Sequence, residues 1–85
     1  MNVTFSERGW NHYLHWQTAD KKILKKINAL IKECQRHPFE GTGKPIQLSG
    51  AVPGFWSRRI TREHRLVYRM KPGALEIVMC RYHYG

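Results

Sequence analysis

The sequence predicts a single α+β domain in which two N-terminal helices pack on one face of a mainly antiparallel sheet. Apolar residues recur at helical spacing in the N-terminal part of the chain. The C-terminal part holds three runs rich in aromatic and β-branched residues, separated by polar or Pro-Gly breaks, which is typical of an antiparallel meander. With strand candidates at 2–5 and 46–48, the expected order is β-α-α-β followed by a three-strand meander, within one domain of residues 1–85.

The first predicted helix follows Ser6, whose hydroxyl can accept hydrogen bonds from free N–H groups of the first turn. Its apolar stripe consists of Trp10, Tyr13, Leu14 and Trp16. At helical spacing such side chains are more often core than a platform for stacking bases. His12 and His15 lie three residues apart on this helix. Without a carboxylate or cysteine nearby in the sequence, they are expected to face solvent rather than bind a metal.

The second predicted helix begins after Asp20, a favourable N-cap, and runs to about Arg36. Its buried stripe consists of Ile23, Ile27, Leu30, Ile31 and Cys34. Lysines occupy most of the remaining surface, as on a solvated helix face that also attracts phosphates over long range. Cys34 and Cys80 lack metal-ligand spacing, so both are expected to be small core residues in a reducing compartment.

Side chains alternate between the two faces of a strand, so the sequence predicts which residues of the meander share a face of the sheet. Arg59 is expected on the same face as Phe55, and Arg65 on the same face as Val67. The last run places one alternating set on a single face: Leu75, Ile77, Met79, Arg81 and His83. Because the helices cover one face of the sheet, the arginine and histidine side chains are expected on the other, open face.

The chain is strongly basic, with 15 Lys and Arg against 6 Asp and Glu and a net charge of +9. This balance indicates a polyanionic partner, either nucleic acid or an acidic protein, although a merely soluble basic domain is the alternative. No stretch approaches the roughly 20 apolar residues of a membrane span, and no signal-peptide pattern opens the chain. We therefore expect a cytoplasmic protein without membrane contact. A free-standing DNA-binding module is disfavoured, because helix-turn-helix and zinc motifs are lacking.

Five longer motifs are more specific than the composition. They are Pro38-Phe39-Glu40-Gly41, Gly43-Lys44-Pro45, Gly54-Phe55-Trp56-Ser57-Arg58-Arg59-Ile60, Glu63-His64-Arg65-Leu66-Val67-Tyr68 and Arg81-Tyr82-His83-Tyr84. Together they resemble the YoeB toxins of YefM–YoeB toxin–antitoxin pairs, within the RelE-like superfamily. The resemblance covers nearly the whole chain, so it implies a small RelE-like fold.

The resemblance also implies a function. Toxins of this family are ribosome-dependent endoribonucleases that cut mRNA in the decoding site. Because no constellation of His, Cys, Asp and Glu has metal-ligand spacing and arginines supply positive charge, we expect the cleavage to need no metal or other cofactor. The resemblance implies neutralisation by a YefM-like antitoxin, whose flexible acidic C-terminal part wraps the toxin. The pair would bind its own promoter DNA mainly through the antitoxin, and a homodimer is expected on the same ground.

The resemblance assigns catalytic roles to Arg59, Arg65, His83 and Tyr84. Family members also carry a glutamate directly after the Lys-Pro of the Gly-Lys-Pro turn, where it acts as general base, but this chain has Ile46. Three positions further on the family often has a basic residue, and this chain has Ser49. Gly85 extends past the usual terminal tyrosine.

The chemistry of RNA cleavage supports the same assignment. Attack by the neighbouring 2′-hydroxyl needs a base for that hydroxyl, cations for the crowded phosphorane and an acid for the 5′-oxygen. Arg65 and Arg59 suit the second task, because guanidinium groups match phosphate oxygens and stay charged. His83 suits the third, because imidazole donates protons near neutral pH. Tyr84 can stack on a base or orient the phosphate.

Other side chains have weaker assignments. Lys44, Arg58 and Arg81 are expected to contact RNA or phosphate, with a surface or partner contact as the simpler interpretation of Arg58. For Arg59 a structural salt bridge is the alternative. His64, at the start of a strand, is expected to be merely exposed.

Two hypotheses about activity stay open. The chain is either an mRNA endonuclease slowed by Ile46, or a non-catalytic protein that binds the ribosome, RNA or an antitoxin and no longer cuts. Incubation with translating ribosomes, followed by mapping of new mRNA 5′ ends, separates the two.

Overall fold

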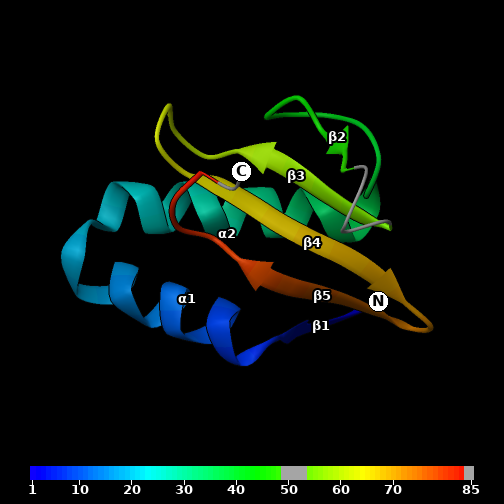
Figure 1. The fold of residues 1–85 in the computed structure, drawn as a ribbon, viewed down its shortest axis with the longest axis horizontal. Helices are drawn as coiled ribbons and strands as arrows, with labels where there is room; N and C mark the ends of the chain where they lie inside the picture. Colours follow the sequence, from blue (N-terminus) through cyan, green and yellow to red (C-terminus); the bar gives the residue numbers. More distant parts are fainter. Residues whose placement is uncertain (49–53, 84–85) are drawn as a thin grey trace.

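The computed structural model describes residues 1–48 and 54–83, which form two helices and five strands. In chain order these are β1 (Asn2–Phe5), α1 (Glu7–Ala19), α2 (Lys21–Arg36), β2 (Ile46–Gln47), β3 (Phe55–Arg59), β4 (Arg65–Lys71) and β5 (Ala74–Met79). The strands make one sheet in the order β1-β5-β4-β3-β2, with β1 parallel to β5 and the other neighbours antiparallel. Figure 1 shows α2 crossing behind this sheet and α1 running beside β5. The predicted α+β architecture is confirmed.

Both helices begin where the sequence predicts. The Ser6 side chain accepts a hydrogen bond from the Gly9 amide at 3.0 Å. The Asp20 carboxylate accepts from the amides of Lys22 and Ile23 at 2.9 and 3.2 Å. Because Asp20 is also the residue that ends α1, the two helices are joined by a single residue and lie side by side.

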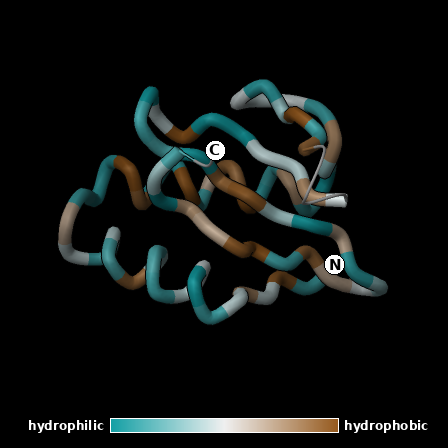
Figure 2. Tube along the Cα trace, in the orientation of Figure 1, coloured by the Kyte–Doolittle hydropathy of each residue, from teal (hydrophilic) through white to brown (hydrophobic). Residues whose placement is uncertain are grey.

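The core lies between α2 and the helix-facing side of the sheet. Its buried members are Trp16, Ile27, Leu30, Ile31, Cys34, Ile60, Leu66, Tyr68, Leu75, Ile77 and Cys80. Figure 2 shows hydrophobic residues gathered along β4 and β5, with hydrophilic ones along the outer turns of α1. Both cysteines are buried free thiols, as predicted. Burial raises the pKa of Cys80 to about 12 and also raises the pKa of Cys34, so both thiols stay protonated at neutral pH.

The predicted stripe of α1 is only partly correct. Trp16 is buried, but Trp10 and Leu14 are 46% and 45% exposed. Instead, Gly9 is the residue of α1 that lies against β5. The two backbones are so close there that a Cβ at position 9 would lie 2.3 Å from the Ile77 carbonyl oxygen. This contact sets the rotation of α1, and Trp10 is left to pack on the edge of the Phe5 ring, with 5.5 Å between ring centroids.

An irregularity in β5 changes the faces predicted for the end of the chain. Val67 pairs with Met79 whereas Tyr68 pairs with Ile77, so Val78 is an extra residue in β5. Ile77 remains in the core, but Met79 and Val78 both line a pocket on the opposite side of the sheet. The strand then ends at Met79. The prediction of one alternating set through Arg81 and His83 is therefore wrong.

Candidate functional site

The face of the sheet that points away from the helices, called here the open face, carries two cross-strand rows. The first row consists of Ile46, Ser57, Val67 and Met79, each paired with the next across β2, β3, β4 and β5. The second row is the direct pair of Arg59 and Arg65, two residues further along β3 and β4. Residues directly opposite in an antiparallel pair have Cβ atoms about 4.5–5.5 Å apart, so the two arginine side chains start from neighbouring points of the open face. The structure thus brings together the two arginines that the sequence singled out.

Arg65 is held in one orientation by the turn that precedes it. Its Nη1 donates hydrogen bonds to the carbonyl oxygens of Thr61, Arg62 and His64, at 2.7, 3.2 and 3.1 Å. Arg59 has an exposed side chain, and within residues 1–48 and 54–83 it forms no ion pair. The alternative of a structural salt bridge for Arg59 is therefore not supported. Two neighbouring like charges that have no ion-pair partner among residues 1–48 and 54–83 favour an anionic ligand.

The residues after β5, Cys80 to His83, are called here the C-terminal segment. It does not continue the strand, because Tyr82 adopts a left-handed backbone conformation with φ of 69°. Its backbone is attached to the rest of the fold at both ends of this turn: Trp16 Nε1 donates to the Cys80 carbonyl at 2.9 Å, and the Arg65 amide donates to the Tyr82 carbonyl at 3.0 Å. His83 follows directly and is exposed. His83 therefore directly follows a residue, Tyr82, whose carbonyl is attached to the Arg65 amide.

Two histidines that the sequence assigned to solvent are part of this attachment. His64 Nδ1 accepts the Tyr82 amide at 2.8 Å, and His12 Nδ1 accepts the Cys80 amide at 3.2 Å. Both side chains are half-buried, so the predictions of simple exposure for His64 and His12 are wrong. His15 instead packs its ring on Trp16, with 4.7 Å between centroids. These pairings join residues 68 and 18 positions apart, which no local sequence signal reveals.

The two histidines are held neutral by their surroundings. Burial lowers the pKa of His64, and the charges of Arg81 and His15 act in the same direction against an opposing effect of Glu63. Burial also lowers the pKa of His12, helped by positive charge on neighbouring side chains, which are Arg8, Arg81, His15 and His64. A neutral imidazole can accept at Nδ1, as both hydrogen bonds require.

Arg58 is fully buried, so its prediction as a surface contact for RNA, phosphate or a partner is wrong. Its fully buried guanidinium donates to the carbonyls of His37, Glu40 and Thr42 and lies 3.5 Å from the Glu33 carboxylate. Its Nε donates to the Tyr68 hydroxyl at 3.1 Å, which in turn donates to the Pro38 carbonyl at 2.6 Å. Strand alternation turns Arg58 toward the helices, where it organises the loop between α2 and β2.

Replacing Arg58 with methionine should lower the free energy of unfolding by about 3 kcal/mol, because three loop carbonyls and one carboxylate lose their donor. Chemical denaturation measures this change. Arg36→Met, at an exposed arginine of α2, is the matched control and should change stability by less than about 0.5 kcal/mol. Equal stabilities of the two variants would contradict the role of Arg58 in holding the loop.

Lys44 and Ile46 lie on segments next to β3, which carries Arg59. Lys44 is exposed and follows Gly43, whose carbonyl accepts the Arg59 amide at 2.7 Å. The Arg81 guanidinium lies 4.6 Å from the centroid of the Tyr82 ring. Ile46 is 56% exposed at the edge strand. Tyr84 and Ser49 lie outside the residues that the structure describes.

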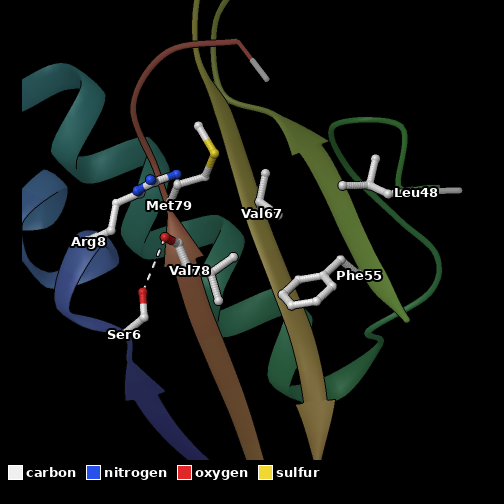
Figure 3. A pocket seen from close by; sticks show the side chains of 7 residues that line it. All are labelled: Ser6, Arg8, Leu48, Phe55, Val67, Val78 and Met79. Carbon is white, nitrogen blue, oxygen red and sulfur yellow. Dashed lines mark hydrogen bonds between the residues drawn. The ribbon is translucent and has the colours of Figure 1, made fainter. Parts of the chain in front are cut away.

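Beside the arginine pair the open face holds an apolar pocket of about 360 Å³. Figure 3 shows its lining residues, which are Ser6, Arg8, Leu48, Phe55, Val67, Val78 and Met79. The Ser6 hydroxyl donates to the Val78 carbonyl at 3.2 Å and closes one end (Figure 3). The sequence did not reveal this pocket, because strict alternation does not place both Val78 and Met79 on one face. An apolar pocket next to cations suits a ligand with both apolar and acidic side chains.

The part of the chain that the structure describes contains neither a membrane-spanning helix nor a metal-binding cluster. No helix there is long and apolar enough to cross a membrane. The same ranges, 1–48 and 54–83, contain no group of three or more His, Cys, Asp or Glu side chains placed to hold a metal ion.

A family model described as the YoeB-like toxin of bacterial type II toxin–antitoxin systems matches residues 5–84. The chain belongs to the YoeB toxin family. Toxin YoeB of Escherichia coli K12 is 57% identical over 84 residues, which span 99% of this chain and 100% of that protein. A YoeB dimer from Staphylococcus aureus has a TM-score of 0.92 and 45% identity, covering 99% of this chain and 98% of that chain. The heterotetrameric YoeB–YefM complex of that species matches with a TM-score of 0.90, 45% identity and the same coverage.

Membership of the YoeB family confirms the resemblance seen in the motifs and gives the chain its general role as the toxin of a toxin–antitoxin system. Arg59 and Arg65 lie on the open face, and Ile46 lies in the adjacent row.

Proposed function

We propose that this YoeB-family toxin cleaves mRNA on the ribosome by metal-free acid–base chemistry. The observation that carries the proposal is the pair of Arg59 and Arg65 on the open face, with the segment bearing His83 attached to the backbone of Arg65. A strong positive charge with few acids nearby favours a phosphodiester as the ligand.

In this mechanism the 2′-oxygen attacks the adjacent phosphorus while the bond from phosphorus to the 5′-oxygen breaks. Arg65 and Arg59 stabilise the negative charge that develops on the phosphorane, because preorganised guanidinium groups need little reorientation. His83 donates a proton to the departing 5′-oxygen, and Tyr84 stacks on a base or orients the phosphate. The products are a 2′,3′-cyclic phosphate and a 5′-hydroxyl end.

The step that this chain performs poorly is removal of the proton from the 2′-hydroxyl. Ile46 stands where the family has a glutamate, and isoleucine cannot accept a proton. The proton must go to water or to a neighbour such as Glu63, which is exposed in the turn before β4. We therefore propose a slow nuclease. A toxin that binds ribosomes without cutting is the second candidate, favoured by the same isoleucine.

Mapping mRNA 5′ ends after incubation with translating ribosomes tests the proposal. New ends that depend on the added protein support an active nuclease. Stalled ribosomes with intact mRNA support the non-catalytic candidate and contradict cleavage.

We also propose a YefM-like antitoxin as the protein partner and a homodimer as the toxin's own assembly, in the cytoplasm where ribosomes are present. The support is the solved complex and dimer of the Staphylococcus aureus relative. An acidic, partly apolar segment of such an antitoxin would suit the apolar pocket and the arginines beside it. Promoter DNA would be bound mainly through the antitoxin.

Binding of RNA should depend strongly on salt. The affinity for a fluorescein-labelled single-stranded RNA should fall at least about tenfold between about 50 and 200 mM NaCl, because each neutralised phosphate releases condensed counterions. Fluorescence anisotropy measures the slope. Arg59→Gln should reduce the slope, whereas Arg36→Gln, on α2, should leave it nearly unchanged. Affinity that is indifferent to salt would indicate an apolar interface instead.

A further inference from the structure

The C-terminal segment is held in an unusual backbone conformation by a small set of side chains. Tyr82 has a positive φ, which costs free energy in a residue other than glycine and persists only where surrounding contacts enforce it. Its amide donates to His64 Nδ1 at 2.8 Å, and its carbonyl accepts from the Arg65 amide at 3.0 Å. The consecutive residues His64 and Arg65 therefore form hydrogen bonds with both backbone polar groups of Tyr82, its N–H and its carbonyl.

The ring of His64 is itself fixed from the other side. It packs edge-on against Trp16, with 4.8 Å between ring centroids and 78° between planes. Trp16 is buried, and its indole nitrogen donates to the Cys80 carbonyl. The His64 ring thus lies between the buried Trp16 and the Tyr82 amide, from which it accepts a hydrogen bond. Its only way to accept at Nδ1 is as a neutral imidazole with the proton on Nε2.

His12 makes a second attachment of the same kind, since its Nδ1 accepts the Cys80 amide at 3.2 Å. Two neutral imidazoles therefore hold alternate amides of the segment that ends in His83. The hydrogen bond to His64 is the shorter of the two. His64 also directly precedes Arg65, and its carbonyl accepts a hydrogen bond from the Arg65 guanidinium.

We propose that His64 is a positioning residue: it accepts a hydrogen bond from the Tyr82 amide and thereby helps to hold the segment that bears the proposed acid His83 on the backbone of the proposed phosphate ligand Arg65. This inference rests on the proposed function for its effect on cleavage. The attachment itself can be tested without any substrate.

Protonation of His64 places a hydrogen on Nδ1 and removes the acceptor, so acid should release the segment. The charged groups that face His64 are Glu63 from its own turn, His15 from α1 and Arg81 from the segment. Burial and the two positive neighbours lower the pKa of His64 below its ordinary value of 6.5, and Glu63 only partly opposes them. The neutral, accepting form therefore dominates at neutral pH and is lost only when the pH falls through this lowered pKa.

The test uses the full chain and three variants. His64→Leu keeps apolar bulk against Trp16 but cannot accept, whereas His64→Asn puts a carbonyl oxygen near the position of Nδ1. His37→Leu, at an exposed histidine that ends α2, is the matched control. Hydrogen exchange of the Tyr82 amide by NMR reports the attachment, and single-turnover cleavage on ribosomes reports its consequence.

We expect the Tyr82 amide to lose protection in His64→Leu at neutral pH. In the unmodified chain protection should be lost at acidic pH, once the pH falls through the lowered pKa of His64. In His64→Asn protection should persist at both pH values. Cleavage by His64→Leu should fall by about tenfold to a hundredfold in kcat with little change in KM for ribosomes, because misplacing a catalytic group impairs the chemical step. His64→Asn should recover most of that rate.

A Tyr82 amide that exchanges equally in the unmodified chain and in His64→Leu would overturn the positioning role, and the acid titration of the unmodified chain decides the matter if His64→Leu does not fold. Unchanged protection at low pH would overturn it as well. Absence of cleavage by the unmodified chain would instead refute the proposed function, and the exchange result would still decide the attachment.

Discussion

His83→Ala is expected to lower single-turnover cleavage of ribosome-bound mRNA by about 10²–10⁴-fold, the usual contribution of one positioned acid. The 5′-oxygen would leave without a proton, so the loss falls on the chemical step rather than on binding. The exposed position of His83 beyond the attached residue Tyr82 means that the fold should not depend on its side chain. Affinity for ribosomes should therefore be nearly unchanged.

His37→Ala is the matched control for this variant, because His37 is also exposed but lies at the end of α2. It should cleave at the rate of the unmodified chain. Cleavage at full rate by His83→Ala would assign the acid to another group, and the rate of a Tyr84→Phe variant would then be the next measurement.

Ile46→Glu is expected to raise single-turnover cleavage on ribosomes by at least about tenfold, within the 10²–10⁴-fold range of general-base catalysis. Ile46 pairs with Ser57 in the row next to Arg59 and Arg65, so a carboxylate there would face the two guanidinium groups. Their positive charge would keep it ionised and ready to accept the 2′-hydroxyl proton. Because Ile46 is more than half exposed, the new charge needs no burial and the fold should tolerate it.

Gln47→Glu is the control, since it adds the same charge one residue away on the other side of β2. It should not accelerate cleavage. RNA affinity of Ile46→Glu should be equal to or slightly below that of the unmodified chain, because a carboxylate beside a phosphate is repulsive. Equal cleavage rates for Ile46→Glu and the unmodified chain would mean that another residue is the base, and Glu63→Gln would test the nearest candidate.

Local signals in the sequence were sufficient for the helices and for much of the sheet. Ser6 and Asp20 were recognisable as N-caps because an N-cap is a local feature. It needs only a side-chain oxygen that accepts a hydrogen bond from an amide two or three residues later. Four of the five predicted stripe residues of α2 are buried and Ile23 is partly buried, because their spacing follows the helical period. Strand alternation likewise predicted that Arg59 and Arg65 share a face, since neither strand is irregular between them.

The placement of the C-terminal segment was decided by the tertiary structure. One extra residue, Val78, shifts the pairing register of β5 and moves Met79 to the open face. The alternation of residues in the sequence does not reveal such a shift. Whether His64 is a surface residue or an acceptor depends on Tyr82, which approaches it only when β5 has been paired.

Arg58 shows the same limit for a charged residue. The sequence determined that it alternates with Arg59, but not that one guanidinium would be solvated and the other buried beneath the loop after α2. Burial of a charge is favourable only where several acceptors converge, and the acceptors of Arg58 come from residues 33 to 42 and from Tyr68. Composition and period describe a residue's own element, whereas the free energy of a buried polar group depends on which distant atoms the fold brings within hydrogen-bond reach.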